Sequence, residues 1–419
     1  MSANQPCSAP PALPQIASYF RASVPALARV VGGRPAIYLD SPNGTQMPEP
    51  VLRAMSDYIR HGMANRHGEF LTSEETEASI HRARRAVADL LGSGSAPVVF
   101  GQNMTSLAFA LATALARDWS APGLVVVSEI DHRANVDPWA SVACDHGLEV
   151  AWLPVDPETV SLDLTQLDRL VAPGTSLVAV SLAANAVGSV QDVRAVTARA
   201  HEVGAIAIVD AVHAVPHLPV NMQTLGADVL LCSAYKFFGP HIGIMAVQGD
   251  LLDRVRTLKV APAPLSGPEK AETGSQNHEA IVGLAATIAY LEGLGGGDSP
   301  AARLHDSMLR IQRYEDQLVA QMVEGLADIP GLRIYRAPDP RPKTPTVAFT
   351  VRGKSPVAIT RYCGDRGVLL THGDFYATIL AERVGVAAQG GWIRAGMAPY
   401  ITPEDVDYAL ATISAASQA

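Results

Sequence analysis

The chain has 419 residues, of which 48% are hydrophobic, and its 41 acidic against 32 basic side chains give a formal net charge of -9. This length and composition are enough for a sizeable core in two or three domains. Because the negative charge opposes binding to phosphate backbones and to anionic lipid, we expect neither nucleic acid nor a membrane as a partner.

The N-terminal segment MSANQPCSAPPALPQIASYF has no basic region followed by an apolar one, and no apolar stretch of the chain reaches membrane-spanning length. The four cysteines are Cys7, Cys144, Cys232 and Cys363. They are widely scattered and form no CxxC pair, so neither a zinc site nor a disulfide framework is expected. These features favour a protein of the reducing cytoplasm.

In chain order, the first strongly patterned segment is TSEETEASIHRARRAVADLLG, which begins at Thr72. Thr72 and Glu75 have the spacing of a capping box, which predicts an N-terminal cap at Thr72. One stripe of the predicted helix holds the apolar residues Ile80, Ala83, Val87, Leu90 and Leu91.

Six short apolar runs follow, separated by segments of helical pattern. They are PVVF (97–100), GLVVVS (123–128), SLVAVSL (176–182), AIAIVDA (205–211), DVLLCS (228–233) and IGIMAV (242–247). Runs this short and this apolar are typical of strands buried on both faces. The sequence therefore predicts an α/β fold in which helices cover a mostly parallel sheet.

The glycine-rich segment EGLGGGDSP (292–300) ends this region and indicates a domain boundary. A long amphipathic helix from Ala302 to Leu326 and a strand VAFTV (347–351) come after it. Thr402 as a cap and Pro403 at the first helical position predict a final helix.

This pattern predicts three parts of the chain. Residues 1–35 would form an N-terminal arm that contributes to the smaller domain, and residues 36–295 would form a large cofactor-binding domain. Residues 296–419 would form a smaller α+β C-terminal domain.

Polar side chains gather where the apolar runs end. The residues concerned are His132, Asn185, Asp210, His213, Ser233 and Lys236. In open α/β sheets, ligands bind outside the carboxyl ends of the strands, so we expect these groups to converge on one site.

Individually, these residues also have plain structural explanations. Asp210 would serve as a cap, Lys236 would extend to solvent, and His132 would be a buried structural histidine. Together they indicate a site for a ligand, because a buried carboxylate needs a cationic partner and a lysine beside apolar residues is often neutralised for chemistry.

The segment FGQNMTS (100–106) follows a strand and opens a helix, so its N–H groups and the Thr105 hydroxyl suit a phosphate. This combination describes pyridoxal phosphate held by a lysine imine.

Three segments carry a resemblance to a known family: IYLDSPNGTQMPEPV (37–51), VDAVHAVPHLPVNMQTLGADVLLCSAYKFFGPHIGIMAV (209–247) and WIRAGMAPYITPEDVD (392–407). The chain resembles the fold type I pyridoxal-phosphate enzymes of the class V aminotransferase group, and most closely their cysteine desulfurase and selenocysteine lyase branch. The resemblance implies a large domain built on a mostly parallel sheet of the seven-stranded type, with a smaller α+β C-terminal domain.

The resemblance also implies roles around the cofactor ring. Lys236 would form the Schiff base with pyridoxal 5'-phosphate and then move the α-proton as a general base. Asp210 would pair with the pyridinium nitrogen. His132 would stack on the ring, and His213 would reach its phenolic oxygen.

The phosphate would be held by the turn at Met104 and Thr105 and by Ser233. Tyr235 stands where the desulfurases usually have a histidine that contacts the phosphate. Ser275 of TGSQN (273–277) would come from the other subunit, so the resemblance implies a homodimer with shared active sites. Asn185 and Arg394 would receive the substrate carboxylate, Arg394 through a bidentate pair.

The chain departs from the desulfurase pattern in the loop GVLLTHGDFYATIL (367–380), which lacks the nucleophilic cysteine. Cys363 lies upstream of it, in a predicted helix, and is expected to be structural. Phe70 stands near the place of a substrate-facing histidine. His372, Asp374 and Tyr376 of the altered loop are candidates for substrate contact or, equally, exposed loop residues.

Because a thiolate is needed to accept sulfur as a persulfide, we expect β-elimination with C–S cleavage from a small amino acid rather than sulfur delivery. Amino transfer or racemisation on the same fold are alternatives.

The motif SAYK, which ends at Lys236, matches the S-x-x-K of penicillin-binding proteins without its accompanying motifs. Asp210, His213 and His217 would be the ligands of a metal-dependent hydrolase, and a non-catalytic binding protein is the last alternative.

Overall fold

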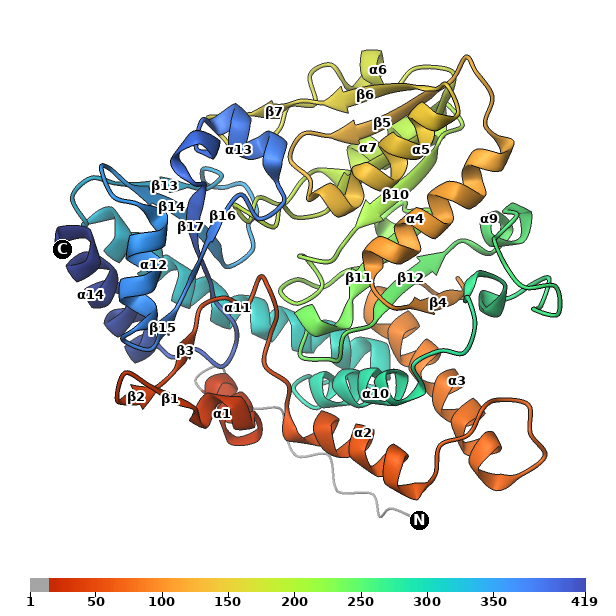
Figure 1. Ribbon diagram of the computed structural model, residues 1–419, viewed down its shortest axis with the longest axis horizontal. Helices are drawn as coiled ribbons and strands as arrows, with labels where there is room; N and C mark the ends of the chain where they lie inside the picture. The colour runs from red at the N-terminus through yellow and green to blue at the C-terminus, as the bar shows by residue number, and fades with distance from the viewer. Residues whose placement is uncertain (1–14) are drawn as a thin grey trace.

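The computed structural model describes residues 15–419, so Cys7 lies outside it. A large α/β part and a smaller part lie side by side, and the long helix α11 (Pro300–Ala327) packs against elements of both (Figure 1). Within the described residues, no helix combines the length and apolar character needed to cross a membrane.

Helices account for much of both parts. Besides α11 they are α1 (Ile16–Ser23), α2 (Glu49–His61), α3 (Leu71–Leu91), α4 (Met104–Leu115), α5 (Asp137–Asp145), α6 (Leu167–Leu170), α7 (Val193–Glu202), α8 (Met222–Leu225), α9 (Gly249–Arg254), α10 (His278–Glu292), α12 (Pro356–Gly364), α13 (Thr378–Val384) and α14 (Pro403–Gln418).

The large part is built on a seven-stranded sheet. Its strands, in spatial order, are β4 (Val98–Gly101), β12 (Gly243–Val247), β11 (Val229–Ser233), β10 (Ile206–Asp210), β9 (Thr175–Ser181), β5 (Leu124–Ser128) and β6 (Glu149–Leu153). β12 runs antiparallel to β4 and β11, and the other pairs are parallel. The predicted α/β class and mostly parallel sheet are therefore confirmed.

Six of these strands are the six apolar runs of the sequence, and alternate residues enter different cores. Val125 and Val127 face the cluster under α4 and α5, while Val126 between them belongs to the cluster on the opposite face. The seventh strand, β6, was not predicted. It lies at the sheet edge, and its first four residues are exposed or only partly buried, so it lacks the continuous apolar run that marked the others.

The smaller part contains an antiparallel sheet of β13 (Leu332–Tyr335), β14 (Thr346–Val351), β17 (Trp392–Gly396) and β16 (Thr371–Gly373). The remaining strands are β1 (Val30–Val31), β2 (Arg34–Pro35), β3 (Ile37–Tyr38), β7 (Val155–Asp156), β8 (Ser161–Leu162) and β15 (Val368–Leu369).

The N-terminal strand β3 pairs in parallel with β15, and Asp40 bridges to Gly396 of β17. Residues 37–40 are thus joined to C-terminal strands before the chain enters the large part. The predicted domain boundaries stay a prediction.

One predicted helix cap is wrong. α3 begins at Leu71 with Phe70 in the cap position, so Thr72 lies inside the first turn, and no side chain caps the helix. The preceding chain is instead tied down by Ser73, whose hydroxyl accepts from Gly68 N at 2.7 Å and donates to Asn65 O at 2.7 Å. The apolar stripe predicted for this helix is buried.

The final helix, α14, begins as predicted. Thr402 Oγ1 accepts from Asp405 N at 3.2 Å, Asp405 Oδ2 accepts from Thr402 N at 3.1 Å, and Pro403 takes the first helical position. The long predicted helix is α11, which extends slightly beyond both predicted ends.

Candidate functional site

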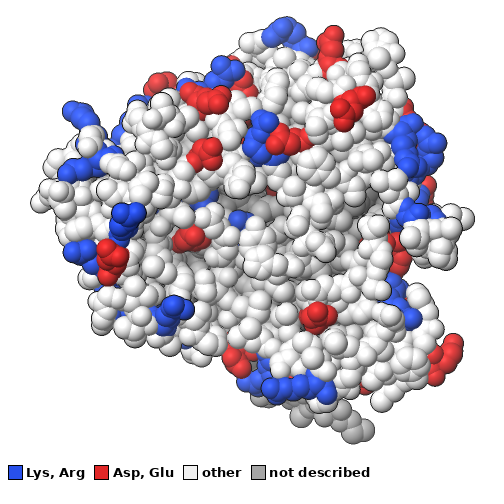
Figure 2. All heavy atoms as spheres, viewed as in Figure 1, with Lys and Arg blue, Asp and Glu red and all other residues white. Residues whose placement is uncertain are grey.

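A cavity of about 470 Å³ opens at the carboxyl ends of β9, β10 and β11. The N-terminus of α4, the turn at Pro42 and Asn43, and the loop 371–376 of the smaller part complete its wall. A hollow with blue Lys or Arg atoms inside it is visible near the middle of the face in Figure 2. The parallel strand ends, as predicted, deliver polar groups to one place.

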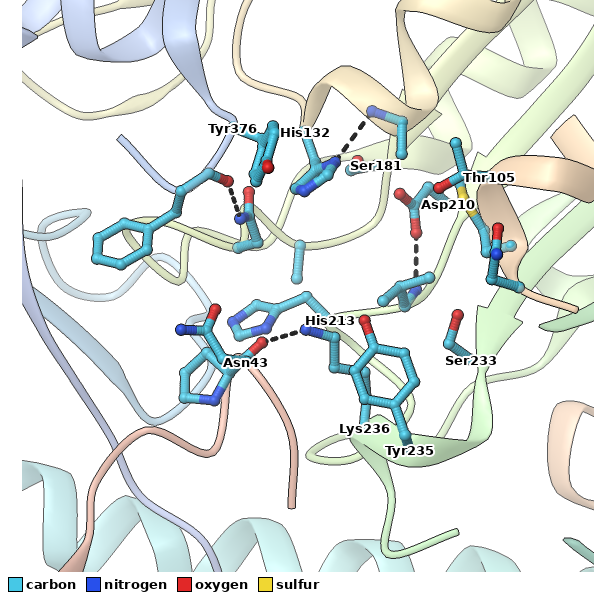
Figure 3. A pocket seen from close by; sticks show the side chains of 18 of the residues that line it. Asn43, Thr105, His132, Ser181, Asp210, His213, Ser233, Tyr235, Lys236 and Tyr376 are labelled. Atoms are coloured by element: carbon cyan, nitrogen blue, oxygen red, sulfur yellow. Dashed lines mark hydrogen bonds between the residues drawn. The ribbon is translucent and has the colours of Figure 1, made fainter. Parts of the chain in front are cut away.

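Lys236 enters this cavity from the short 3-10 turn Ala234–Lys236 that follows β11. The rings of Phe237 and Phe238 are fully buried, which anchors the turn and leaves the lysine side chain directed to the cavity (Figure 3). Its Nζ donates a hydrogen bond to Pro42 O. Burial and the nearby Arg394 guanidinium lower the pKa of Lys236 to about 7, so a neutral amine is accessible near neutral pH.

Asp210 ends β10 and lines the same cavity. It is 6% exposed, and its Oδ1 accepts from Val212 N at 2.7 Å. Burial raises the pKa of this carboxyl to about 7. No ion pair to Asp210 exists among residues 15–419, so the group is suited to a cationic ligand.

Two imidazoles line the cavity in neutral form. His132 Nδ1 accepts from Ala134 N at 3.0 Å, and burial and Lys236 lower the pKa of His132 to about 4. His213 Nε2 lies 3.1 Å from the hydroxyls of both Thr344 and Thr346, and burial holds its pKa well below the usual range. A neutral His132 ring is free to lie against a flat ligand.

The N-terminus of α4 points at the cavity, with Met104 and Thr105 in its wall. Asn103 caps the helix through a capping box with Ser106, but the first-turn N–H groups have no intrahelical acceptor. Together with the Ser233 hydroxyl, these donors at the positive end of a helix form an anion site. Tyr235 also lines the cavity, and its ring stacks on His241 at 4.5 Å.

Arg394 and Asn185 come together as predicted. Arg394 of β17 is 1% exposed and lies just behind the cavity wall, where its Nη1 donates to Asn185 O at 2.8 Å. Its Nη2 donates to Asn43 Oδ1 at 2.5 Å, its face is covered by the Phe375 ring at 3.7 Å, and its Nε has no partner.

Sequence reasoning missed Asn43 and Phe375. Asn43 belongs to the turn SPNG that follows β3, and this turn was the available signal. Phe375 carried no signal, because its position depends on how the loop folds back over β17.

A family model described as aminotransferase class-V matches residues 37–409. The chain belongs to this family. It is 31% identical over 403 residues to a cysteine desulfurase of Pectobacterium atrosepticum, a match that covers 92% of this chain and 94% of the relative. It is 32% identical over 420 residues to a probable cysteine desulfurase 2 of Mycobacterium leprae, with 94% and 95% covered.

Solved structures agree with this assignment. An apo cysteine desulfurase from Thermococcus onnurineus superposes with a TM-score of 0.85 and 26% identity, covering 96% of this chain and 98% of that one. An S-sulfonic acid form of an Escherichia coli cysteine desulfurase gives 0.84 and 26%, with the same coverage. This class V chain is therefore a cysteine desulfurase-like enzyme that depends on pyridoxal phosphate.

The cavity fits this cofactor. A buried carboxyl without an ion-pair partner, an amine, an anion site at a helix N-terminus and a neutral imidazole are the groups that a phosphorylated, cationic, aromatic aldehyde needs. All of these groups come from residues that line one cavity.

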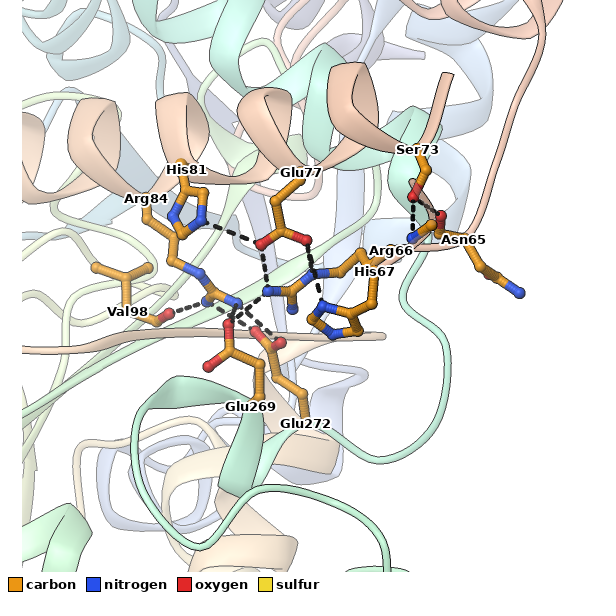
Figure 4. A network of polar contacts seen from close by, with 11 residues as sticks. Asn65, Arg66, His67, Ser73, Glu77, His81, Arg84, Val98, Glu269 and Glu272 are labelled. Carbon is orange, nitrogen blue, oxygen red and sulfur yellow. Dashed lines mark hydrogen bonds and ion pairs between the residues drawn. The ribbon is translucent and has the colours of Figure 1, made fainter. Parts of the chain in front are cut away.

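Ser275 lies outside this cavity and is exposed. It lines a second cavity of about 720 Å³, which shares Asn103 with the first. The segment before it is held by Glu272, which forms a bidentate ion pair with Arg84 at 2.8 and 2.9 Å (Figure 4). Glu272 also accepts from Phe100 N at 2.8 Å. The exposed Ser275 hydroxyl follows three residues after this anchor.

The family relatives are named for desulfuration, yet no described cysteine lines the cavity of this chain. Cys144 is exposed on α5, and Cys232 is buried in β11. Cys363 is buried in α12, and burial raises the pKa of its thiol to about 12. Phe70 also lies away from the cavity and is 55% exposed.

The predicted metal ligands do not form a set. His217 turns away from Asp210, and its Nδ1 hydrogen bonds to Glu315 Oε2 at 2.9 Å in the interior. Residues 15–419 hold no group of three His, Cys, Asp or Glu side chains that could bind a metal ion. The hydrolase alternative therefore has no geometric support.

Proposed function

We propose that this protein is a pyridoxal-phosphate-dependent lyase that removes a sulfur group from the β-carbon of a small amino acid by elimination. The observation that carries the proposal is the cavity itself. It presents Lys236 and Asp210 in the arrangement that chemistry at an α-carbon needs, but none of residues 15–419 brings a thiol into it to accept sulfur.

Bound pyridoxal phosphate supplies an electron-withdrawing ring that weakens the bonds at the α-carbon of an attached amino acid. In our proposal Lys236 holds the cofactor covalently, and Asp210 keeps its ring nitrogen protonated. His132 would pack against the ring, and His213 would lie toward its phenolic oxygen. The first-turn N–H groups of α4 and the hydroxyls of Thr105, Ser233 and Tyr235 would hold the phosphate.

The Lys236 amine, when it does not hold the cofactor, would be the base that removes the α-proton of the substrate. Burial and the nearby Arg394 guanidinium lower the pKa of this lysine, which favours the unprotonated amine that a base needs. The electrons left at the α-carbon expel the sulfur group from the β-carbon. Elimination therefore needs no thiol from the protein, in contrast to persulfide formation.

Arg394 and Asn185 would bind the substrate carboxylate. The Arg394 Nε is a buried donor without a partner, and Asn185 Oδ1 is a buried acceptor without one. Such groups are costly unless a ligand satisfies them. A substrate carboxylate bound at the Nε and Nη2 edge of Arg394 would satisfy the Nε donor if Asn43 moved aside.

Replacement of Arg394 by lysine is expected to lower kcat/KM by about 100-fold, because lysine keeps the charge but loses the fork that binds a carboxylate. The visible spectrum of the bound cofactor should not change. Steady-state kinetics on Arg394→Lys measure this, with Arg333→Lys on the exposed surface of β13 as the matched control. An unchanged kcat/KM would remove Arg394 from the substrate site.

We further propose a homodimer in which Ser275 completes the phosphate site of the partner subunit. The exposure of Ser275 outside its own cavity supports this arrangement. Sedimentation of the cofactor-loaded protein should give the mass of two chains. A monomer that binds the cofactor fully would contradict it. The cytoplasmic location expected from the sequence stays a prediction.

The reaction is tested by recording the visible spectrum of the purified protein and then offering it a panel of amino acids. Pyruvate together with a released thiol or sulfide would support the lyase. A new keto acid that retains the side chain would instead indicate amino transfer, and loss of optical activity alone would indicate racemisation.

A further inference from the structure

The loop 371–377 contains two consecutive residues in the left-handed backbone region. Phe375 has φ 56° and Tyr376 has φ 58°. For a residue with a Cβ, this conformation costs about 1 kcal/mol or more and persists only where the surroundings enforce it. Two such residues in succession indicate that the directions of their side chains matter.

Three hydrogen bonds from three segments enforce this turn. Asp374 Oδ1 accepts from Tyr376 N at 2.9 Å, and Asn185 Nδ2 donates to Phe375 O at 2.8 Å. Arg133 N donates to Tyr376 O at 2.9 Å. The turn is thus fixed from its own loop, from the segment after β9 and from the segment after β5.

Because of this turn, the rings of Phe375 and Tyr376 each contact a residue of the candidate site. The Phe375 ring covers the Arg394 guanidinium at 3.7 Å. The Tyr376 ring lies beside His132 at 5.2 Å with a 34° tilt (Figure 3). Tyr376 lines the cavity and is 67% exposed, and its hydroxyl has no hydrogen-bond partner among residues 15–419. A proton donor is therefore left free at the outer wall.

Three other polar groups of this wall make hydrogen bonds within the protein. His132 Nδ1 accepts from a backbone N–H, and burial keeps its ring neutral. His372 Nδ1 is hydrogen bonded to Thr360 Oγ1 at 2.9 Å, and Asp374 Oδ1 holds Tyr376 N. Lys236 is committed to the α-proton in the proposed reaction.

We propose that Tyr376 is the general acid that protonates the departing sulfur group, an inference that rests on the proposed lyase function. Lys236 takes the proton from the α-carbon, the bond from the β-carbon to sulfur breaks, and its electron pair leaves with sulfur. The sulfur takes the phenolic proton of Tyr376, and the proton that Lys236 took from the α-carbon returns through solvent to the phenolate, so that both side chains regain their starting state. No oxidant or reductant is needed.

The test compares two substrates whose leaving groups differ in their need for a proton. Methanethiolate leaves S-methyl-L-cysteine poorly unless it is protonated, whereas chloride leaves β-chloro-L-alanine without a proton. Tyr376→Phe keeps the ring and should lower pyruvate release from S-methyl-L-cysteine by about 100-fold, within the range for a general acid. Release from β-chloro-L-alanine should stay at the wild-type level.

The control variant is Tyr362→Phe, a tyrosine of α12 outside the cavity. Titration of the apoprotein with pyridoxal phosphate, followed by absorbance, should give the same affinity for wild type and both variants. Equal losses on the two substrates, or no loss on either, would overturn the role of Tyr376 while leaving the lyase function standing. Wild-type protein that releases no pyruvate from either substrate would refute both proposals.

Discussion

Replacement of Lys236 by alanine is expected to abolish turnover while the fold stays intact. The side chain provides both the covalent attachment of the cofactor and the base for the α-proton in our proposal, so kcat should fall by about 10⁴-fold or more. The fold should tolerate the change, because burial disfavours the charged form of this lysine in the first place. Steady-state kinetics and thermal unfolding of Lys236→Ala measure the two effects.

A labelling experiment separates this role from a purely structural one. Borohydride reduction of the loaded wild-type protein should leave the cofactor mass on the peptide that contains Lys236, and the variant should carry no such label. Lys354→Ala, which removes a lysine outside the cavity, should behave as wild type in both assays. Full activity of the Lys236 variant, or a label on another lysine, would contradict the assignment.

The large sheet could be predicted because strands buried on both faces must be apolar along their whole length. This requirement made β5, β9, β10 and β11 visible in the sequence. β6 was missed because its first four residues are exposed or only partly buried, whereas most of β4, at the other edge, is buried and apolar. The cap at Thr72 was predicted from local spacing alone. Contacts of Ser73 with residues 65 and 68 decided the helix start instead.

The same reasoning explains which site residues were accessible from sequence. Asp210 and Lys236 follow parallel strands, and the carboxyl ends of such strands meet at one edge. Arg394 was named only through the family resemblance, and Asn43 and Phe375 were missed; these three reach the site from the smaller part and from the turn after β3. Their meeting depends on how the two parts pack, and no local pattern encodes that packing.

Replacement of Asp210 by asparagine is the second change with a large expected effect. Asparagine keeps an acceptor for Val212 N but cannot hold a proton on the cofactor ring nitrogen, so kcat should fall by about 10³-fold, in the middle of the range for proton-transfer groups. Pyridoxal phosphate should still bind, because the phosphate site is unchanged. Kinetics and a cofactor titration of Asp210→Asn measure both expectations.

The apoprotein gives a readout that does not depend on activity. Burial raises the pKa of Asp210 in the folded chain to about 7 from its ordinary value of 3.8, so between these pH values the folded chain holds a proton that the unfolded chain has lost. Stability contributed by this group is therefore full below pH 4 and falls as pH rises to 7, by up to roughly 4 kcal/mol. Asparagine does not ionise, so the variant does not lose this stability as pH rises. The variant apoprotein should therefore unfold at a higher temperature than wild type at pH 8, and the difference between the two unfolding temperatures should be smaller at pH 5.

Bound cofactor should have the opposite effect on the relative stability of wild type and Asp210→Asn. A protonated ring nitrogen would pair with the Asp210 carboxylate, so the cofactor should stabilise wild type at pH 8 more than it stabilises Asp210→Asn. Thermal unfolding of both proteins with and without pyridoxal phosphate measures how much the cofactor stabilises each of them. Equal stabilisation of the two would show that Asp210 has no cationic partner in the loaded enzyme, and its unpaired burial would then need another explanation than the cofactor.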